Sequence, residues 1–460
     1  MQPSKQTGCS RKPAFPLFEN TFRQAVSPIE EFLHQESSSG VLLMICVAVA
    51  LVIANSPLYP AYDSFLHTKL TIGTPGFSIS HSIHHWINDG LMALFFFVIG
   101  LEVKREILIG ELSNLRQAIL PLGAAIGGMI IPAGIYLLFN QSGNAVNGWG
   151  IPMATDIAFA VGVIALLGSR VPRSLVAMLL ALAIVDDIGA VLVIALFYTD
   201  TIHTGALFFS GICLVMLIAV NLAGIRRPLP YVILGIVLWL AMMKSGVHAT
   251  LAGVLAAFTV PARSSCDAEQ FSSTIESLAA DFKAQIGDTS GSSQLQVLRN
   301  SKKQAILQSI ENSVYRMESP LHRMEHGLHG WVSFLIIPVF ALANAGIPID
   351  FPRLGDILLH PVTIGIMAGL LFGKVIGVTL CSWIIITFRL SHLPEGVTLS
   401  QVIGIGLLAG IGFTMSIFIA SLAFGPYPEY LLNAKIGIVF VSIIAGTAGY
   451  LWLRAVTRES

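Results

Sequence analysis

The sequence predicts an all-α polytopic membrane protein with about twelve transmembrane helices. Of its 460 residues, 54% are hydrophobic and 11% are charged, and the mean hydropathy is +0.77. A soluble domain carries roughly 25% charged residues, so a water-soluble globule is excluded. One bilayer crossing takes about 20 apolar residues, which leaves this chain room for a dozen crossings and their loops. The net charge is zero and no dense basic stripe is present, so no nucleic acid partner is expected.

Twelve apolar stretches supply the expected spans. They lie near 40–55, 86–101, 118–139, 148–169, 174–199, 204–224, 229–243, 246–261, 330–347, 361–388, 402–425 and 433–453. We divide the chain into a cytoplasmic tail (1–39), spans 1–8 (40–260), a polar cytoplasmic insertion (261–319), spans 9–12 (320–455) and a cytoplasmic tail (456–460). The insertion has helix-like apolar spacing on both sides of a Gly/Ser-rich joint. We expect two short helices there, as a tolerated insertion rather than a regulatory domain.

The positions of Lys and Arg test the number of spans independently. Cytoplasmic loops hold the excess of positive residues, and the twelve-span division places 21 of the 26 Lys and Arg residues on one side and 4 on the other. Both termini are therefore expected in the cytoplasm. The first 40 residues lack the features of a cleaved signal peptide, so the first span is expected to stay in the membrane.

Four ionisable residues lie near the centres of expected spans: Asp156, Asp186, Asp187 and Lys374. Inserting each such residue at the centre of a membrane helix costs about 2.5–3.5 kcal/mol, so a structural or functional role is expected for each. One ammonium cannot neutralise three carboxylates, and the surplus requires a cation or protons. The alternative is a set of buried ion pairs that only fixes helix packing. Adjacent helical residues point about 100° apart, so we expect one of Asp186 and Asp187 to meet Lys374 while the other faces a cavity.

Gly and Pro residues interrupt two of the expected spans. Pro152 precedes Asp156 in span 4, and Gly410, Gly412 and Thr414 lie at the centre of span 11. Helices can break at such positions and leave half-helix ends at the midplane. Spans 3–5 and 10–12 have opposite topology, and each triplet has its interrupted member in the middle. This arrangement is typical of an inverted repeat, although ordinary close packing also uses glycine.

Several motifs resemble those of the NhaA family of bacterial sodium/proton antiporters. They occur in family order between about residue 40 and residue 455. The matching segments are 100–106 (GLEVKRE), 154–160 (ATDIAFA), 168–172 (GSRVP), 181–190 (ALAIVDDIGA), 244–253 (KSGVHATLAG), 373–374 (GK) and 410–420 (GIGFTMSIFIA). The implied fold, two inverted triplets with crossing broken helices, agrees with the topology counted above.

The resemblance implies a role for each buried polar residue. Asp186 and Asp187 match the pair that binds Na⁺ and protons, with Asp187 the principal ligand. Thr155 would add an oxygen. Asp156, which we also count with the ion- and proton-binding residues, and Lys374 would compensate the dipole ends of the broken helices. Lys374 would pair with Asp186 when no cation is present.

Competition for these carboxylates is sufficient to couple two ion flows. If Na⁺ binds only the deprotonated pair and two protons replace it, the site changes its access from one side of the membrane to the other mainly when it is loaded. We expect a secondary antiporter, not an enzyme, that exports Na⁺ or Li⁺ for more than one proton by alternating access. Such exchange is electrogenic and is driven by the proton gradient and the membrane potential. We expect pH regulation, a bacterial inner membrane location and no cofactor, and the resemblance implies a possible homodimer.

Two groups of residues are candidates for a pH response. Glu102 and Glu106 lie four residues apart at the cytoplasmic end of span 2. The sequence alone favours an ordinary surface helix end there, and the family resemblance makes an acidic funnel an equal alternative. His322, Glu325, His326 and His329 share one helical face. That spacing also fits zinc, but we favour protonation of His326 and His329 together with Glu325.

Other titratable residues are weaker candidates. His248 is a further candidate for a pH response. The cluster of His81, His84 and His85 is expected to be solvated or packed in an outward loop. Five cysteines without a C-x-x-C motif predict neither a disulfide framework nor a zinc site.

Two other functional classes stay open at this point. An intramembrane aspartyl protease could use Asp156 and Asp187, but that chemistry requires neither the adjacent acid pair nor Lys374, and the sequence lacks a G-x-G-D stretch. A cation channel usually builds its filter from repeated subunits, and no such repeat occurs here.

Overall fold

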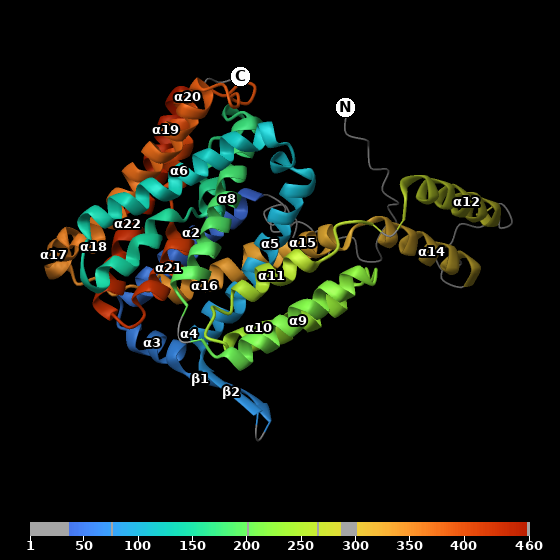
Figure 1. Cartoon of the computed structure of the whole chain (residues 1–460), viewed down its shortest axis with the longest axis horizontal. Coiled ribbons are helices and arrows are strands. Elements are labelled where there is room, and N and C mark those ends of the chain that lie inside the picture. The colour runs from blue at the N-terminus through green and yellow to red at the C-terminus, as the bar shows by residue number, and fades with distance from the viewer. Residues whose placement is uncertain (1–35, 75–76, 200–201, 265, 287–300, 458–460) are drawn as a thin grey trace, which may run out of the picture.

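The computed structural model describes residues 36–74, 77–199, 202–264, 266–286 and 301–457 (Figure 1). Three expected features lie wholly or partly outside these residues: most of the N-terminal tail, the Gly/Ser joint of the insertion and the last residues of the C-terminal tail. The division of the chain into segments stays a prediction.

The described chain is almost entirely helical. Its longer helices are α2 (Glu36–Ala54), α5 (Met92–Ile109), α6 (Leu115–Phe139), α8 (Arg173–Phe197), α9 (Thr204–Leu222), α10 (Pro228–Met243), α12 (Ala268–Ile286), α14 (Ser301–Met317), α15 (Pro320–Trp331), α19 (Lys374–Thr387), α20 (Leu399–Ala409), α21 (Phe413–Phe424) and α22 (Pro428–Val456). Shorter α-helices are α3 (Tyr59–His67), α4 (Ile83–His85), α7 (Ile157–Ala165), α11 (Leu251–Thr259), α16 (Ile337–Asn344), α17 (Leu354–Leu359) and α18 (Pro361–Ala368). The π-helical turns are η1 (Trp86–Leu91), η5 (Val332–Ile336) and η7 (Gly369–Gly373), and the 3₁₀ segments are η2 (Glu111–Ser113), η3 (Gly143–Met153), η4 (Gly168–Arg170) and η6 (Phe351–Arg353).

Helix length and composition identify a polytopic membrane protein. In the described residues, six helices are long and apolar enough to cross a bilayer, and nine spans result if each of three bent helix pairs is one span. Three expected spans are outside this count. Helix α10 has 16 residues and α11 has nine, and α5 has 18 residues but carries four charged side chains. The all-α membrane fold is therefore established, and the number twelve stays a prediction.

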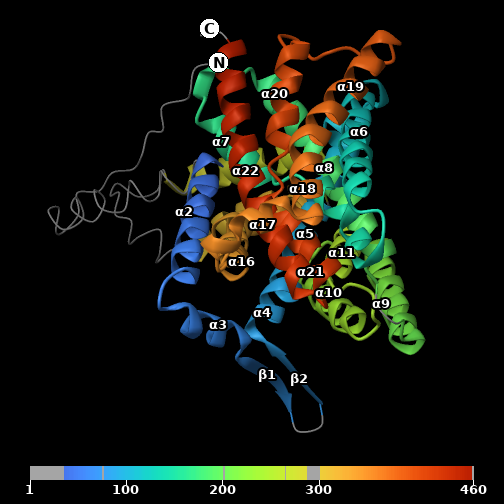
Figure 2. The same cartoon turned by 90° about the vertical axis from the view of Figure 1, so that its left-hand side faces the viewer.

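One element was not predicted. The loop between the first two expected spans contains an antiparallel hairpin of β1 (Lys69–Thr74) and β2 (Phe77–Ser82), with Leu70 opposite His81. The hairpin projects from the end of the molecule opposite to the C-terminal end of α22 (Figure 2). At six residues each, its strands are too short to stand out from a loop in a sequence dominated by helical spans.

Helix α6 is central to the packing around the buried charges. It contacts α8 on one side and α18 and α19 on the other, while α5 packs against α11. The two helices of the insertion, α12 and α14, pack against each other and extend away from the bundle (Figure 1). The insertion therefore leaves the arrangement around α6 undisturbed.

Two bends occur in the middle of apolar spans. The axis turns by 43° between η3 and α7, and by 47° between α20 and α21. The first break covers residues 154–156 and follows Pro152, which lies inside η3, and the second covers residues 410–412. The outer half of the first broken span is a 3₁₀ segment of 11 residues, which is long for that conformation and is typical of a hinge or a strained sequence.

The contact of α5 with α11 depends on glycine and gives a test of the fold. A methyl group at Gly253 would meet the carbonyl oxygen of Ala93 and lie 2.9 Å from the nitrogen of Phe97. Gly253→Ala should therefore destabilise the protein by about 1–3 kcal/mol, measured as the unfolding temperature in detergent.

Gly211 in α9 is the matched control because a methyl group there has no atom within 4 Å. Gly211→Ala should leave the unfolding temperature unchanged or raise it, since alanine is the better helix former by about 1 kcal/mol. Equal unfolding temperatures for the two variants would contradict this packing.

Candidate functional site

The breaks of the two bent spans lie against each other. The Asp156 amide donates to the carbonyl of Ile411 at 2.7 Å, and Thr155 Oγ1 donates to the carbonyl of Ala409 at 3.0 Å. The backbone groups that each break releases are thus satisfied by the other break. Ser416, which the sequence reasoning missed, adds a bond from Oγ to the carbonyl of Ile151 at 2.8 Å.

Asp156 caps both half-helices that begin at this crossing. Its Oδ1 accepts from the Phe159 amide at 3.0 Å, and its Oδ2 accepts from the amide and the hydroxyl of Thr414 at 2.9 and 2.6 Å. The N-termini of α7 and α21 both carry partial positive charge, so a single carboxylate stabilises the two ends together. Both of its oxygens are occupied by these bonds.

Asp186 and Lys374 form a fully buried ion pair. Lys374 Nζ lies 2.6 Å from Asp186 Oδ2, and Thr155 Oγ1 lies 2.7 Å from the same oxygen. The one hydroxyl proton of Thr155 is therefore shared between this carboxylate and the Ala409 carbonyl. Asp186 is 1% exposed and Lys374 is 0% exposed. One of the two adjacent aspartates therefore meets the lysine, as expected from their angular separation.

Asp187 lies beside this pair without an equivalent partner. It is 1% exposed, and within the described part of the chain its Oδ1 has no hydrogen-bond partner, as is also true of Oδ1 of Asp186. A buried acceptor left unpaired costs about 1–3 kcal/mol. The two adjacent Oδ1 atoms are therefore the ones best able to accept a proton or a cation.

Comparison with known proteins identifies the family of this chain. A sequence model of the Na⁺/H⁺ antiporter 1 family matches residues 30–453. The chain belongs to this family. It is 47% identical over 444 residues to the Na⁺/H⁺ antiporter NhaA 1 of Saccharophagus degradans, covering 96% of this chain and 95% of the relative. It is 48% identical over 444 residues to the NhaA antiporter of Sulfurimonas denitrificans, covering 96% and 98%.

A second polar network in this family member joins α5 to α15. Arg105 lies 3.0 Å from Glu106 Oε1 and 2.8 Å from Glu325 Oε1, and Glu325 is buried. The two groups proposed for a pH response are therefore connected through a residue that the sequence reasoning did not single out. Its position next to Glu106 was the only sequence signal.

The histidines of α15 are on its outside. His326 and His329 are exposed, and the rings of His322 and His326 stack at 6.1 Å. Across the described residues, no group of three or more His, Cys, Asp or Glu side chains is placed to hold a metal ion. The zinc alternative for this face therefore has no geometric support.

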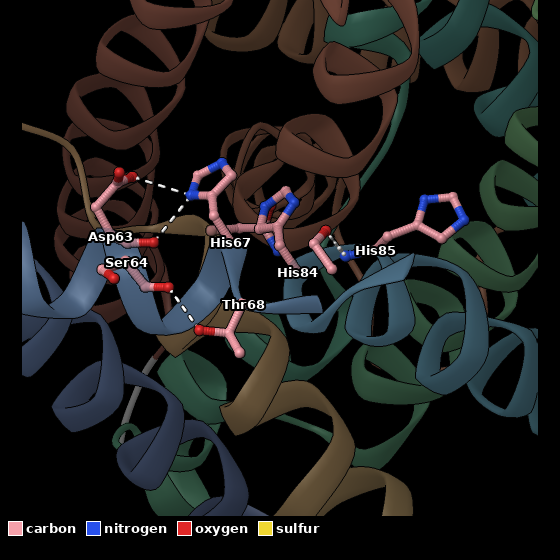
Figure 3. A network of polar contacts seen from close by, with 8 residues as sticks. Asp63, Ser64, His67, Thr68, His84 and His85 are labelled. Atoms are coloured by element: carbon pink, nitrogen blue, oxygen red, sulfur yellow. Dashed lines mark hydrogen bonds and ion pairs between the residues drawn. The ribbon is translucent and has the colours of Figure 1, made fainter. Parts of the chain in front are cut away.

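His248 and His84 make ring and hydrogen-bond contacts with neighbouring helices. The His248 ring contacts Phe418 of α21 edge-on at 5.6 Å, and its Nδ1 lies 2.8 Å from Thr250 Oγ1. His84 Nε2 lies 3.2 Å from Asn344 Oδ1. Burial lowers the pKa of His84 to about 4, so this ring is neutral near pH 7. Figure 3 shows His85 directed away from His67 and His84.

The cap on α21 predicts the effect of removing one hydroxyl. Thr414→Val deletes the 2.6 Å bond to Asp156 while keeping the side-chain shape. Because hydrogen bonds to charged groups contribute about 1.5–3 kcal/mol, the variant should lose this much stability in a thermal unfolding assay.

Thr379→Val is the control, since in the described structure Thr379 Oγ1 is buried and makes no hydrogen bond. Its unfolding temperature should match or exceed that of the parent protein. A Thr414→Val protein as stable as the Thr379→Val protein would show that the cap is not formed.

Proposed function

We propose that this chain is an electrogenic antiporter that exports Na⁺ or Li⁺ from the cytoplasm in exchange for more than one proton. The observation that carries the proposal is the buried pair of Asp186 and Asp187, each with one oxygen that no donor within the described structure contacts. Membership in the Na⁺/H⁺ antiporter 1 family supports the same ions.

The donor set is suited to a small hard cation. Carboxylate, hydroxyl and carbonyl oxygens are the ligands that such cations take. Asp187 would be the principal ligand because its carboxylate is not paired with a lysine. Asp186 and Thr155 would contribute once Lys374 withdraws. In this structure Lys374 and Thr155 both engage the same oxygen of Asp186.

Exchange then follows from competition. Protons and Na⁺ bind the same carboxylate oxygens, and the empty site would carry surplus negative charge at a depth where water is absent. The site therefore switches its opening between the two sides of the membrane when it holds a cation or protons. More than one proton moves per Na⁺, so the membrane potential contributes to the driving force.

Asp156 acts mainly in charge compensation under this proposal. Three hydrogen bonds to the starts of α7 and α21 occupy its two oxygens. This arrangement supports the helix-capping role over the ligand role that the sequence also suggested. It also weighs against the protease alternative, in which Asp156 would have to act on a peptide bond together with Asp187.

The finer topology belongs to the proposal as well. We propose twelve spans, an inverted repeat of spans 3–5 and 10–12, both termini in the cytoplasm, and a location in a bacterial inner membrane. The protein would work without a cofactor, catalyse no covalent reaction and associate as a homodimer. Regulation by pH would act through Glu102, Glu106, Glu325, His326 and His329, with Arg105 joining two of the acids.

The central test is the removal of one charge. Asp187→Asn keeps the side-chain volume but cannot hold a cation or release a proton at neutral pH, so exchange should fall at least about 100-fold, in line with the loss of a charged ligand worth several kcal/mol. The measurement is Na⁺- or Li⁺-driven proton flux in proteoliposomes between pH 6 and 9.

Asp356→Asn, at an exposed position in α17, should exchange ions at the parental rate. Sodium-driven proton release by the Asp187→Asn protein at a rate comparable to this control would overturn the assignment. Single-channel currents, or cleavage of a peptide in detergent without ions, would instead favour the channel or the protease.

A further inference from the structure

A proline in α6 releases one backbone carbonyl beside the buried charges. Pro132 lies inside the helix and has no N–H, so the carbonyl of Gly128 loses its usual helical donor four residues later. Pro121 in the same helix likewise releases the carbonyl of Gln117, near the start of the helix. In the hydrocarbon region such a carbonyl is a strong acceptor.

The released carbonyl belongs to a residue in contact with Lys374. A Cβ atom at Gly128 would lie 3.6 Å from Cδ and 3.8 Å from Nζ of Lys374. The approach is close because Gly127 of α6 and Gly377 of α19 meet backbone to backbone. The peptide group of Gly128 is thus adjacent to the lysine stem and its ammonium.

Pro132 also contacts the turn that precedes Lys374. A Cβ atom at Gly373, the last residue of η7, would lie 2.7 Å from Cα of Pro132. Turns of π-helix occur frequently at functional sites. Pro132 therefore touches the segment that orients the lysine and also frees an acceptor next to it.

Cation binding at Asp186 creates a need for such an acceptor. Lys374 donates to Asp186 Oδ2 at 2.6 Å, and a cation bound to the Asp186 carboxylate neutralises its charge and repels the ammonium. A buried ammonium without an acceptor is costly. The lysine side chain is flexible and its ammonium carries three rotatable donors, so a small rotation is enough to find a new partner.

We infer that the Gly128 carbonyl, released by Pro132, accepts the Lys374 ammonium when a cation displaces it from Asp186. This inference rests on the proposed function. Pro132 and Gly128 are then positioning residues: they bind no ion but stabilise the cation-loaded state through Lys374.

The test is Pro132→Ala in the full chain. Alanine restores an N–H that hydrogen-bonds to the Gly128 carbonyl and competes with the ammonium. The KM for Na⁺ in proteoliposomes should rise about threefold to tenfold, the effect of weakening one hydrogen bond to a charged group, while the maximal rate stays within about twofold. Alanine favours the helix, so the variant is expected to fold.

Pro121→Ala is the matched control, because it also restores a helical N–H but at a carbonyl near the start of α6. It should leave the KM for Na⁺ at the parental value. Gly128→Ala is a second variant: its methyl group would lie 3.2 Å from Val378 Cγ2 and against the lysine stem, and it should also raise the KM.

An unchanged KM in Pro132→Ala, an equal rise in Pro121→Ala, or a loss of maximal rate alone would each overturn the inference. A parent protein that exchanges no Na⁺ for protons would instead overturn the proposed function, so the two failures are distinguished by the same assay.

Discussion

Charge balance at the centre of the bilayer governs this structure. Lys374 and Asp186 satisfy each other at 2.6 Å with almost no exposure, and in a medium without water neither could stay charged alone. This pair does not neutralise the negative charge that Asp187 would carry when deprotonated. A purely structural ion pair would need no third acid, and removing Asp187 would make the site easier to bury. Its presence is understandable only if an occupant from outside the chain balances it.

The broken spans make this balance possible by bringing backbone ends to the same depth. Unpaired helix ends are normally excluded from hydrocarbon, yet here each break supplies partners to the other through the amide of Asp156 and the hydroxyl of Thr155. Asp156 then neutralises two helix N-termini at once. One residue of this crossing, Thr155, also donates to Asp186, so the scaffold and the ion site are joined by a single hydroxyl. A movement of either half-helix would therefore alter the ligand set directly.

Glycine contacts decide how closely the charged helices approach. Met129 of α6 contacts Gly189 of α8, and Gly127 of α6 contacts Gly377 of α19. Helix α6 is thereby held between the helix with the aspartates and the helix with the lysine. Close approach through small residues is the usual way for membrane helices to gain packing energy. Here it also fixes the distance between opposite charges on two helices that do not adjoin in sequence.

The sequence by itself determined the class of the protein, the four charges within apolar spans and the positions at which two spans break. Hydropathy, charge asymmetry and the placement of Gly and Pro act locally, within one span and its loops, and so can be recognised without a structure. Membership in the antiporter family was also readable from the motifs.

Periodicity leaves Asp186 and Asp187 equivalent as partners of Lys374, and only the family resemblance pointed to Asp186. The tertiary structure shows this contact, which joins residues 188 positions apart. The tertiary structure also revealed the Arg105 link between α5 and α15 and the contact of Ser416 with Ile151. It likewise showed that both oxygens of Asp156 accept hydrogen bonds from the starts of α7 and α21. The β1–β2 hairpin was missed since its short strands leave little trace beside long apolar helices. Contacts between distant segments depend on how helices pack, and packing is not encoded in the pattern of any one segment.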